Sequence, residues 1–108
     1  MTETLGEIIA DCIRPSTWGS PAERETKRRV RVAVAAYAYE VEAAPIMSDA
    51  EFDALAASID LTIDTTRPAM DKWFRENFEP HTGQWVLRHP DIDGLRRTLA
   101  RLRQSLTA

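Results

Sequence analysis

Between Pro21 and Pro45 the chain runs without another proline or a glycine, and this uninterrupted stretch constrains the fold more than any other feature. Proline is favoured in the first turn of a helix and disruptive in its interior, so the stretch predicts one long helix over about residues 21–43. Two apolar stripes lie on different sides of this helix: Val30, Val34, Tyr37 and Val41 form one, and Val32, Ala36, Tyr39 and Ala43 form the other. A helix that is apolar on two sides must be covered on two sides.

A second helix is predicted shortly after Pro45. Ser48 and Glu51 form a capping box, in which the side chain of each residue bonds to the backbone amide of the other. The helix is expected over about residues 48–60 and would form a helical hairpin with the first one. Its buried face should hold Phe52, Leu55 and Ile59.

Apolar residues at helical spacing predict three further helices. An N-terminal helix that ends before Pro15 is indicated by Leu5, Ile8, Ile9, Cys12 and Ile13. A helix over residues 68–78 is indicated by Met70, Trp73, Phe74 and Phe78. A leucine-rich C-terminal helix is indicated by Ile92, Leu95, Leu99, Leu102 and Leu106. Residues 84–87, which precede this last helix, are expected to be extended.

Together these elements predict an all-α fold, with a single domain of about five helices over residues 1–108. The helical hairpin would form its centre, and residues 67–108 would form a C-terminal helical extension. The leucine seam of that extension is expected to pack on the long helix, because a seam of about two heptads is short for a coiled coil. A homodimer through the C-terminal helix is the alternative.

The composition is that of an ordinary globular protein. The chain has 108 residues, of which 44% are hydrophobic and 29% are charged, and this suits one domain with one core. No run approaches the roughly 18 apolar residues of a membrane span, and the N-terminal residues are acidic where a secretory signal would be basic. The single Cys12 cannot form an internal disulfide. We therefore expect a cytoplasmic protein that does not contact a membrane.

The net charge of −3 conceals an uneven distribution along the chain. Residues 32–66 hold seven acids and no base, whereas residues 23–31 and 94–108 are rich in arginine. The basic residues considered for contact with DNA phosphates are Lys27, Arg28, Arg31, Arg97 and Arg101. The acidic middle of the same chain can neutralise them, so nucleic-acid binding is not expected.

Residues 37–55 carry the densest motif of the chain, Tyr-x-Tyr-x-Val-x-x-Ala-Pro-x-x-Ser-Asp-Ala-Glu-Phe-Asp-x-Leu. This motif resembles the N-terminal helical domain, or domain Ia, of bacterial NAD-dependent DNA ligases, and the resemblance covers residues 35–60. In that family the domain closes over the nicotinamide mononucleotide half of NAD during adenylation of the enzyme. The resemblance implies a recognition site at Tyr39, Glu40, Asp49, Phe52 and Asp53.

The spacing of these residues is compatible with such chemistry. Asp49, Phe52 and Asp53 stand at i, i+3 and i+4, so they share one side of their helix. Two carboxylates beside an aromatic ring can hold a cationic ring or ribose hydroxyls, and Tyr39 could stack from the opposing helix. Two positions depart from the family. Glu40 replaces a histidine and adds negative charge near a phosphate, and Phe52 replaces a tyrosine and removes a hydroxyl donor.

Catalysis of ligation is not expected. The ligase nucleophile is a lysine in Lys-x-Asp-Gly, and the lysines of this chain, Lys27 and Lys72, lie in other contexts. Residues 91–94 read Asp-Ile-Asp-Gly, with Asp91 where the lysine would stand, and a carboxylate cannot form the phosphoramidate with AMP. Residues 73–95 have no counterpart in the ligase domain and are similar to the tail of small stand-alone ligase-related proteins of phages and prophages.

Two further groups of residues are candidate sites. Trp73, Phe74 and Trp85 could offer an aromatic surface to a protein partner, although aromatic residues in so small a domain more often lie in the core. His81 and His89 lie near two aspartates in an irregular segment. Their spacing matches no common zinc pattern, so no metal is expected.

The function expected first is that of a non-catalytic adaptor of phage or prophage type, derived from the ligase domain, which binds an unidentified protein and no cofactor. A module that binds NAD or nicotinamide mononucleotide is the alternative, and a DNA-associated accessory protein is a weaker one. The position of the C-terminal helix separates the first two. If it lies on Val32, Ala36 and Tyr39, it fills the space that a nucleotide needs, whereas an open acidic pocket at that place favours the nucleotide.

Overall fold

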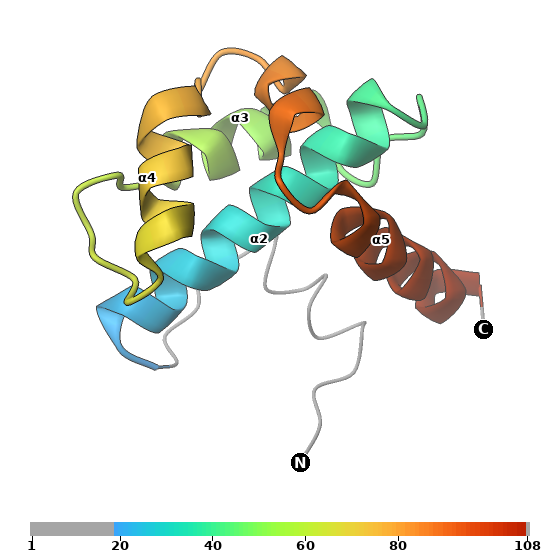
Figure 1. Ribbon diagram of the computed structural model, residues 1–108. Coiled ribbons are helices and arrows are strands. Elements are labelled where there is room, and N and C mark those ends of the chain that lie inside the picture. Colours follow the sequence, from blue (N-terminus) through green and yellow to red (C-terminus); the bar gives the residue numbers. More distant parts are fainter. Residues whose placement is uncertain (1–18, 108) are drawn as a thin grey trace.

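Helix α2 (Pro21–Glu40) is the element around which the rest of the chain is arranged (Figure 1). The computed structural model describes residues 19–107, which hold four α-helices, one 3-10 helix and no strand. The elements after α2 are α3 (Asp49–Ser58), α4 (Pro68–Asn77), the 3-10 helix η1 (Gln84–Arg88) and α5 (Ile92–Thr107). The all-α fold is therefore confirmed, and none of these described helices is long and apolar enough to cross a membrane. The N-terminal helix predicted from Leu5 to Ile13 lies outside the described residues.

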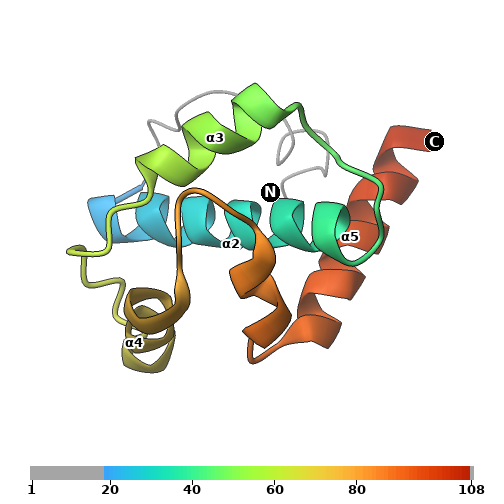
Figure 2. The same cartoon turned by 90° about the horizontal axis from the view of Figure 1, so that it is seen from above.

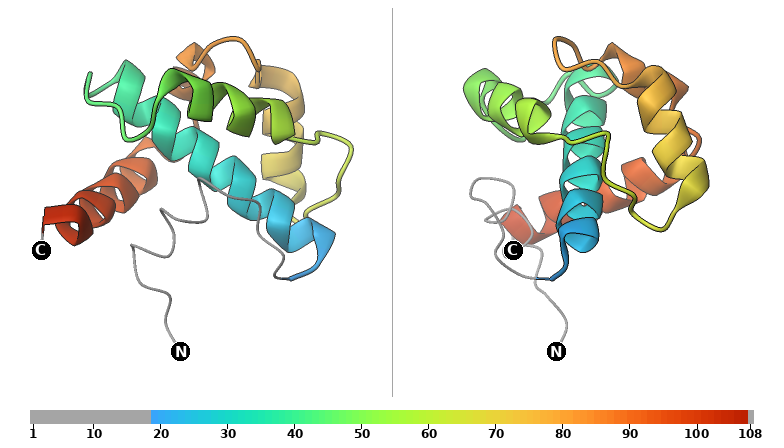
Figure 3. Two further views of the ribbon diagram at one scale, coloured as in Figure 1. Left: turned by 180° about the vertical axis from the view of Figure 1, so that it is seen from behind. Right: turned by 90° about the vertical axis from the view of Figure 1, so that its left-hand side faces the viewer.

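The other elements enclose α2 along much of its length. α3 and α4 lie on opposite sides of it (Figure 2 and Figure 3), and η1 and α5 also contact it. Every residue from Val32 to Ala38 is buried, which confirms that both apolar sides of this part of the helix are covered. Beyond the ends of this segment, Val30, Tyr39 and Val41 stay 47%, 56% and 46% exposed.

Helix α2 ends earlier than predicted. Its last residue is Glu40, and Ala43, which was expected to be helical, adopts a left-handed backbone with a φ of 52°. The amide of Ala44 bonds back to the carbonyl of Ala38 at 3.0 Å. Such a left-handed turn commonly closes a helix, so the chain has already left the helix before it reaches Pro45.

Helix α3 begins with the predicted capping box. The Ser48 hydroxyl accepts a hydrogen bond from the amide of Glu51 at 3.1 Å, and the Glu51 carboxylate accepts one from the amide of Ser48 at 3.2 Å. The helix ends at Ser58, slightly before the predicted end. Leu55 and Ala56 are its buried residues, and they belong to the same core as α2.

The C-terminal extension buries aromatic residues in this core. Phe74 of α4 and Trp85 of η1 are 2% and 1% exposed, and the ring of Phe78 lies edge-on to Trp85 at 5.1 Å between centroids. Residues 84–87 were predicted to be extended, and this prediction is wrong, because they belong to η1. The amide of Val86 bonds to the carbonyl of Gly83 at 3.1 Å, and the resulting turn directs Trp85 into the core.

Helix α5 packs on α2 through its leucines. Leu95, Leu99 and Leu102 are buried, so the described part of the seam is covered within the chain. This is the arrangement expected first, and it leaves these three leucines unavailable for a homodimer. Towards the end of the helix, Arg103 forms an ion pair with Glu42, which follows α2.

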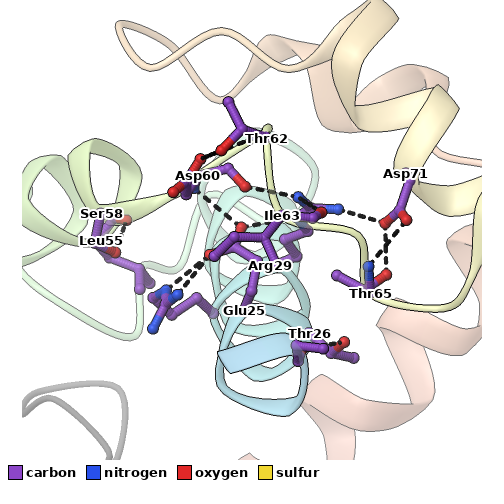
Figure 4. A network of polar contacts seen from close by, with 12 residues as sticks. Glu25, Thr26, Arg29, Leu55, Ser58, Asp60, Thr62, Ile63, Thr65 and Asp71 are labelled. Atoms are coloured by element: carbon purple, nitrogen blue, oxygen red, sulfur yellow. Dashed lines mark hydrogen bonds and ion pairs between the residues drawn. The ribbon is translucent and has the colours of Figure 1, made fainter. Parts of the chain in front are cut away.

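A buried network of charged groups ties α4 and the preceding loop to α2 (Figure 4). The Arg29 guanidinium donates to the carboxylates of Glu25 at 2.8 Å and Asp71 at 2.7 Å. These three residues are 4%, 0% and 3% exposed, respectively. Arg29 also donates to the carbonyls of Asp60 and Ile63, at 2.9 and 3.3 Å. Charges at this depth are stable only when they are paired and hydrogen-bonded, and here every member is.

Asp71 is the residue through which this network holds α4. Thr65 donates both its hydroxyl and its amide to the carboxylate of Asp71, the latter at 3.0 Å. Burial by itself raises the pKa of Asp71, but the bonds from Thr65 and the charge of Arg29 outweigh it and hold this pKa below the ordinary value of 3.8. The network was not predicted, although Glu25 and Arg29 stand at the i, i+4 spacing of a helical ion pair.

Candidate functional site

A cavity of about 570 Å³ opens at the C-terminal end of α2. Helices α2 and α3 form two of its walls, and the turn between them closes one end. Residues 81–84, which end at the first residue of η1, form a third wall. Figure 2 shows the segment between α4 and η1 passing across α2 towards α3. The volume lies within the range of about 300–1,000 Å³ that is typical of small-molecule sites.

All five positions implied by the ligase resemblance line this cavity. Tyr39 and Glu40 come from the last turn of α2, and Asp49, Phe52 and Asp53 come from the first turns of α3. The structure therefore brings together residues that the sequence placed on two separate helices. That they bind a nucleotide stays a prediction.

Local sequence explains how these side chains reach the cavity. The capping box holds the first turn of α3, so the three α3 residues are presented from an ordered helix end. The left-handed Ala43 turns the chain between the two helices. Pro45, Ile46 and Met47 then line the end of the cavity at this turn.

The third wall was not predicted. It consists of His81, Thr82, Gly83 and Gln84. Gly83 is buried against α2, and a Cβ at this position would lie 3.2 Å from the Cβ of Ala36, so even a methyl group would press the segment outward. Nothing in the local sequence marks this contact, because the wall and the hairpin meet only when the whole chain folds.

The cavity is acidic and partly aromatic. Its charged and aromatic lining consists of Tyr39, Glu40, Asp49, Phe52, Asp53 and His81. Three carboxylates therefore share the space with one imidazole, the one basic side chain among the described lining residues. Among the lining residues that the structure describes, none comes from α5, so the described part of the C-terminal helix leaves the space over Ala36 and Tyr39 open. Carboxylates next to aromatic faces are suited to hold a ring cation.

The aromatic residues considered for a partner surface are largely internal. Phe74 and Trp85 lie in the core, so the prediction that they face a partner is wrong for these two. Burial of a large ring removes much apolar surface from water, and this stabilises a small domain. Trp73 is half-buried, and its indole N–H donates to the carbonyl of Arg88 at 3.1 Å. Of the three residues, Trp73 alone keeps substantial contact with solvent.

His81 and His89 lie in different cavities. His89 lines a second one, of about 300 Å³, between α2, α4 and the start of α5. Its Nδ1 accepts a hydrogen bond from the amide of Asp91 at 3.0 Å. The Asp91 carboxylate accepts one from the amide of Gly94, also at 3.0 Å, so Asp91 caps the start of α5. Burial lowers the pKa of His89, although the Asp91 carboxylate acts in the opposite direction. Within residues 19–107 no three potential metal ligands are grouped together.

Two of the basic residues considered for DNA contact are engaged inside the chain. Arg28 pairs with the buried carboxylate of Glu25 at 2.7 Å, and Arg31 is 6% exposed. Both therefore add little to an exposed cationic face on α2. Arg97 and Arg101 are exposed on α5.

The described residues form an all-α domain with an acidic cavity of small-molecule size. No protein-family model matches this chain, and comparison with curated proteins and with solved structures gave no significant match. The resemblance to the ligase domain rests on the residues of the motif at positions 37–55.

Proposed function

We propose that this chain is a binding module for a small nucleotide with a cationic ring, of the kind represented by nicotinamide mononucleotide. The single observation that carries the proposal is the convergence of Tyr39, Glu40, Asp49, Phe52 and Asp53 on one open cavity. These are the positions that the ligase resemblance implies. The adaptor role, expected first from the sequence, becomes the second proposal.

The cavity offers suitable groups to the ring and the ribose of such a ligand. Tyr39 and Phe52 can stack on a pyridinium ring, and the carboxylates of Asp49 and Asp53 can balance its charge or accept from ribose hydroxyls. Tyr39 is 56% exposed, so its ring can turn towards a ligand without disturbing the core. The interaction of a ring cation with one exposed aromatic face contributes about 0.5–1 kcal/mol, so several such contacts are needed together.

Glu40 and Phe52 limit the affinity that we expect. Phe52 lacks the hydroxyl of the family's tyrosine, and one lost hydrogen bond costs about 0.5–1.5 kcal/mol. Glu40 places a carboxylate where the family has histidine, which disfavours a phosphate group. We therefore expect binding with a Kd of about 0.1–1 mM.

An NMR titration of isotopically labelled protein with nicotinamide mononucleotide, and then with NAD, tests this proposal. Saturable shifts are expected for the amides of residues 37–55 and 81–84. Asp53→Asn should weaken binding about three- to fivefold, because an exposed charge pair contributes up to about 1 kcal/mol. Glu76→Gln, which changes an exposed carboxylate on α4 outside the cavity, is the matched control and should bind as the unchanged protein does. Absence of saturable shifts at millimolar ligand contradicts the proposal.

One exposed apolar residue favours a protein-interaction role as the second proposal. Leu87 of η1 is 59% exposed, and the half-buried Trp73 bonds to the residue that follows it. Leu87 has the largest exposed fraction among the large apolar side chains of residues 19–105, so a protein could dock there. Co-purification with proteins encoded beside this chain tests the role, with Leu87→Asp expected to lose the partner and to keep its thermal stability. Retention of the partner by this variant contradicts a contact through Leu87.

A further inference from the structure

We propose that His81 is the anion-recognising residue of the cavity and that it makes ligand binding depend on pH. This inference rests on the proposed nucleotide-binding function and adds to it a residue from the segment that has no counterpart in the ligase domain. Among the described residues that line the cavity, His81 is the one that can carry a positive charge.

His81 is attached to a well-anchored wall. Trp85, 1% exposed, donates its indole N–H to the carbonyl of Thr82 at 2.7 Å, and the amide of Gln84 donates to the hydroxyl of Thr82 at 3.2 Å. Gly83 packs closely on α2. His81 itself is exposed, and it lines the cavity at the start of this wall.

The charges around His81 explain why its protonation matters. Glu40 faces the cavity from α2, and Asp49 and Asp53 face it from α3; Tyr39 is the remaining titratable group of the lining. While His81 is neutral, a phosphate in this cavity meets carboxylates and no cationic side chain among the described lining residues. Histidine changes charge between about pH 5 and pH 8, and a protonated imidazole offers the phosphate a charge-assisted hydrogen bond. A ring cation without a phosphate is instead repelled by the protonated imidazole.

Titration with two ligands at two pH values tests this inference. Nicotinamide mononucleotide carries the ring, the ribose and a phosphate, whereas nicotinamide riboside carries the ring and the ribose without the phosphate. Relative to His81→Gln, the unchanged protein should gain about three- to fivefold in affinity for the mononucleotide between about pH 7.5 and pH 6, and it should gain none for the riboside. His81→Lys should bind the mononucleotide more tightly than His81→Gln at both pH values. The phosphate itself takes up a proton near pH 6, an effect that is common to all variants and cancels in the comparison.

The outcomes separate this inference from the proposed function. If both ligands bind and His81→Gln has the same pH dependence as the unchanged protein, His81 is not the anion contact, while the cavity still binds the ring. If neither ligand binds at either pH, the proposed function fails and this inference fails with it. The amide spectrum of each variant without ligand verifies that it is folded.

Discussion

Replacement of Asp71 by asparagine removes one charge from the buried network and almost no volume. The carboxylate of Asp71, 3% exposed, accepts one bond from Arg29 and two from Thr65. Asparagine keeps one acceptor oxygen and turns an NH₂ group towards these donors. The bond between the Arg29 guanidinium and a carboxylate is therefore lost, together with at least one bond from Thr65. The bond from the Arg29 guanidinium contributes about 1.5–3 kcal/mol and a bond from the uncharged Thr65 about 1 kcal/mol, so Asp71→Asn should lower the free energy of unfolding by about 2.5–4 kcal/mol.

Equilibrium unfolding in urea, followed by circular dichroism, measures this loss. The whole domain has a free energy of unfolding of only about 5–15 kcal/mol, so the variant should unfold at a much lower urea concentration. Glu76→Gln on the same helix is the matched control. Its ion pair with Lys72, at 3.7 Å, joins side chains that are 56% and 74% exposed, so its loss should cost less than about 0.5 kcal/mol. A loss for Asp71→Asn below about 1 kcal/mol, the value of one neutral bond, would refute the reasoning.

The same proteins give a second readout in acid. The folded-state pKa of Asp71 lies below its ordinary value of 3.8, so the stabilisation from the ionised carboxylate is present above that value and is lost as the pH falls through the folded-state pKa. The unchanged protein should lose stability on acidification below about pH 4, and Asp71→Asn should lose less of it over the same range. Equal acid sensitivity of the two proteins would show that Asp71 does not contribute in this way.

Three further predictions concern caps and turns. Ser48→Ala removes the hydroxyl that caps α3 and should cost about 1 kcal/mol in urea unfolding; an unchanged midpoint would mean that the cap contributes nothing. Thr66 has a φ of 66°, which is unfavourable for a β-branched residue, so Thr66→Gly should raise the free energy of unfolding by about 0.5–1 kcal/mol, and a lower melting temperature would contradict this. The pKa of His89 is lowered from its ordinary value of 6.5, so the unfolded chain takes up the proton first and stability should fall as the pH drops below 6.5. His89→Asn should flatten this dependence in urea unfolding, and an identical pH profile would rule out His89 as its origin.

Helix positions were predictable because their signals are local. Pro21 and the capping box at Ser48 mark two helix starts, and the leucine spacing marks α5. Helical periodicity also places Asp49, Phe52 and Asp53, the three α3 residues that line the cavity, on one side of that helix. The end of α2 was less predictable, because it depends on a left-handed Ala43, and alanine has no local preference for that backbone.

The aromatic residues illustrate where spacing is insufficient. Spacing placed Trp73 and Phe74 on one helix, but it could not decide between a partner surface and the core. Phe74 and Trp85 both lie in the core. Trp85 points inward because the 3-10 helix η1 is found where an extended segment was predicted. Burial of a ring depends on what packs above it, which lies elsewhere in the chain.

The sequence by itself determined the helices and the side chains that each one presents, since these follow from neighbours within a few turns. Only the tertiary structure decided which of those side chains meet. Arg29 and Asp71 are 42 positions apart, and His81 lies 41 positions after Glu40 of the same cavity, so no short window of sequence contains either encounter. Exclusion of water then changed the chemistry. An ion pair that would contribute little at the surface became a network whose members cannot be left unpaired, and three carboxylates of two helices became the lining of one cavity.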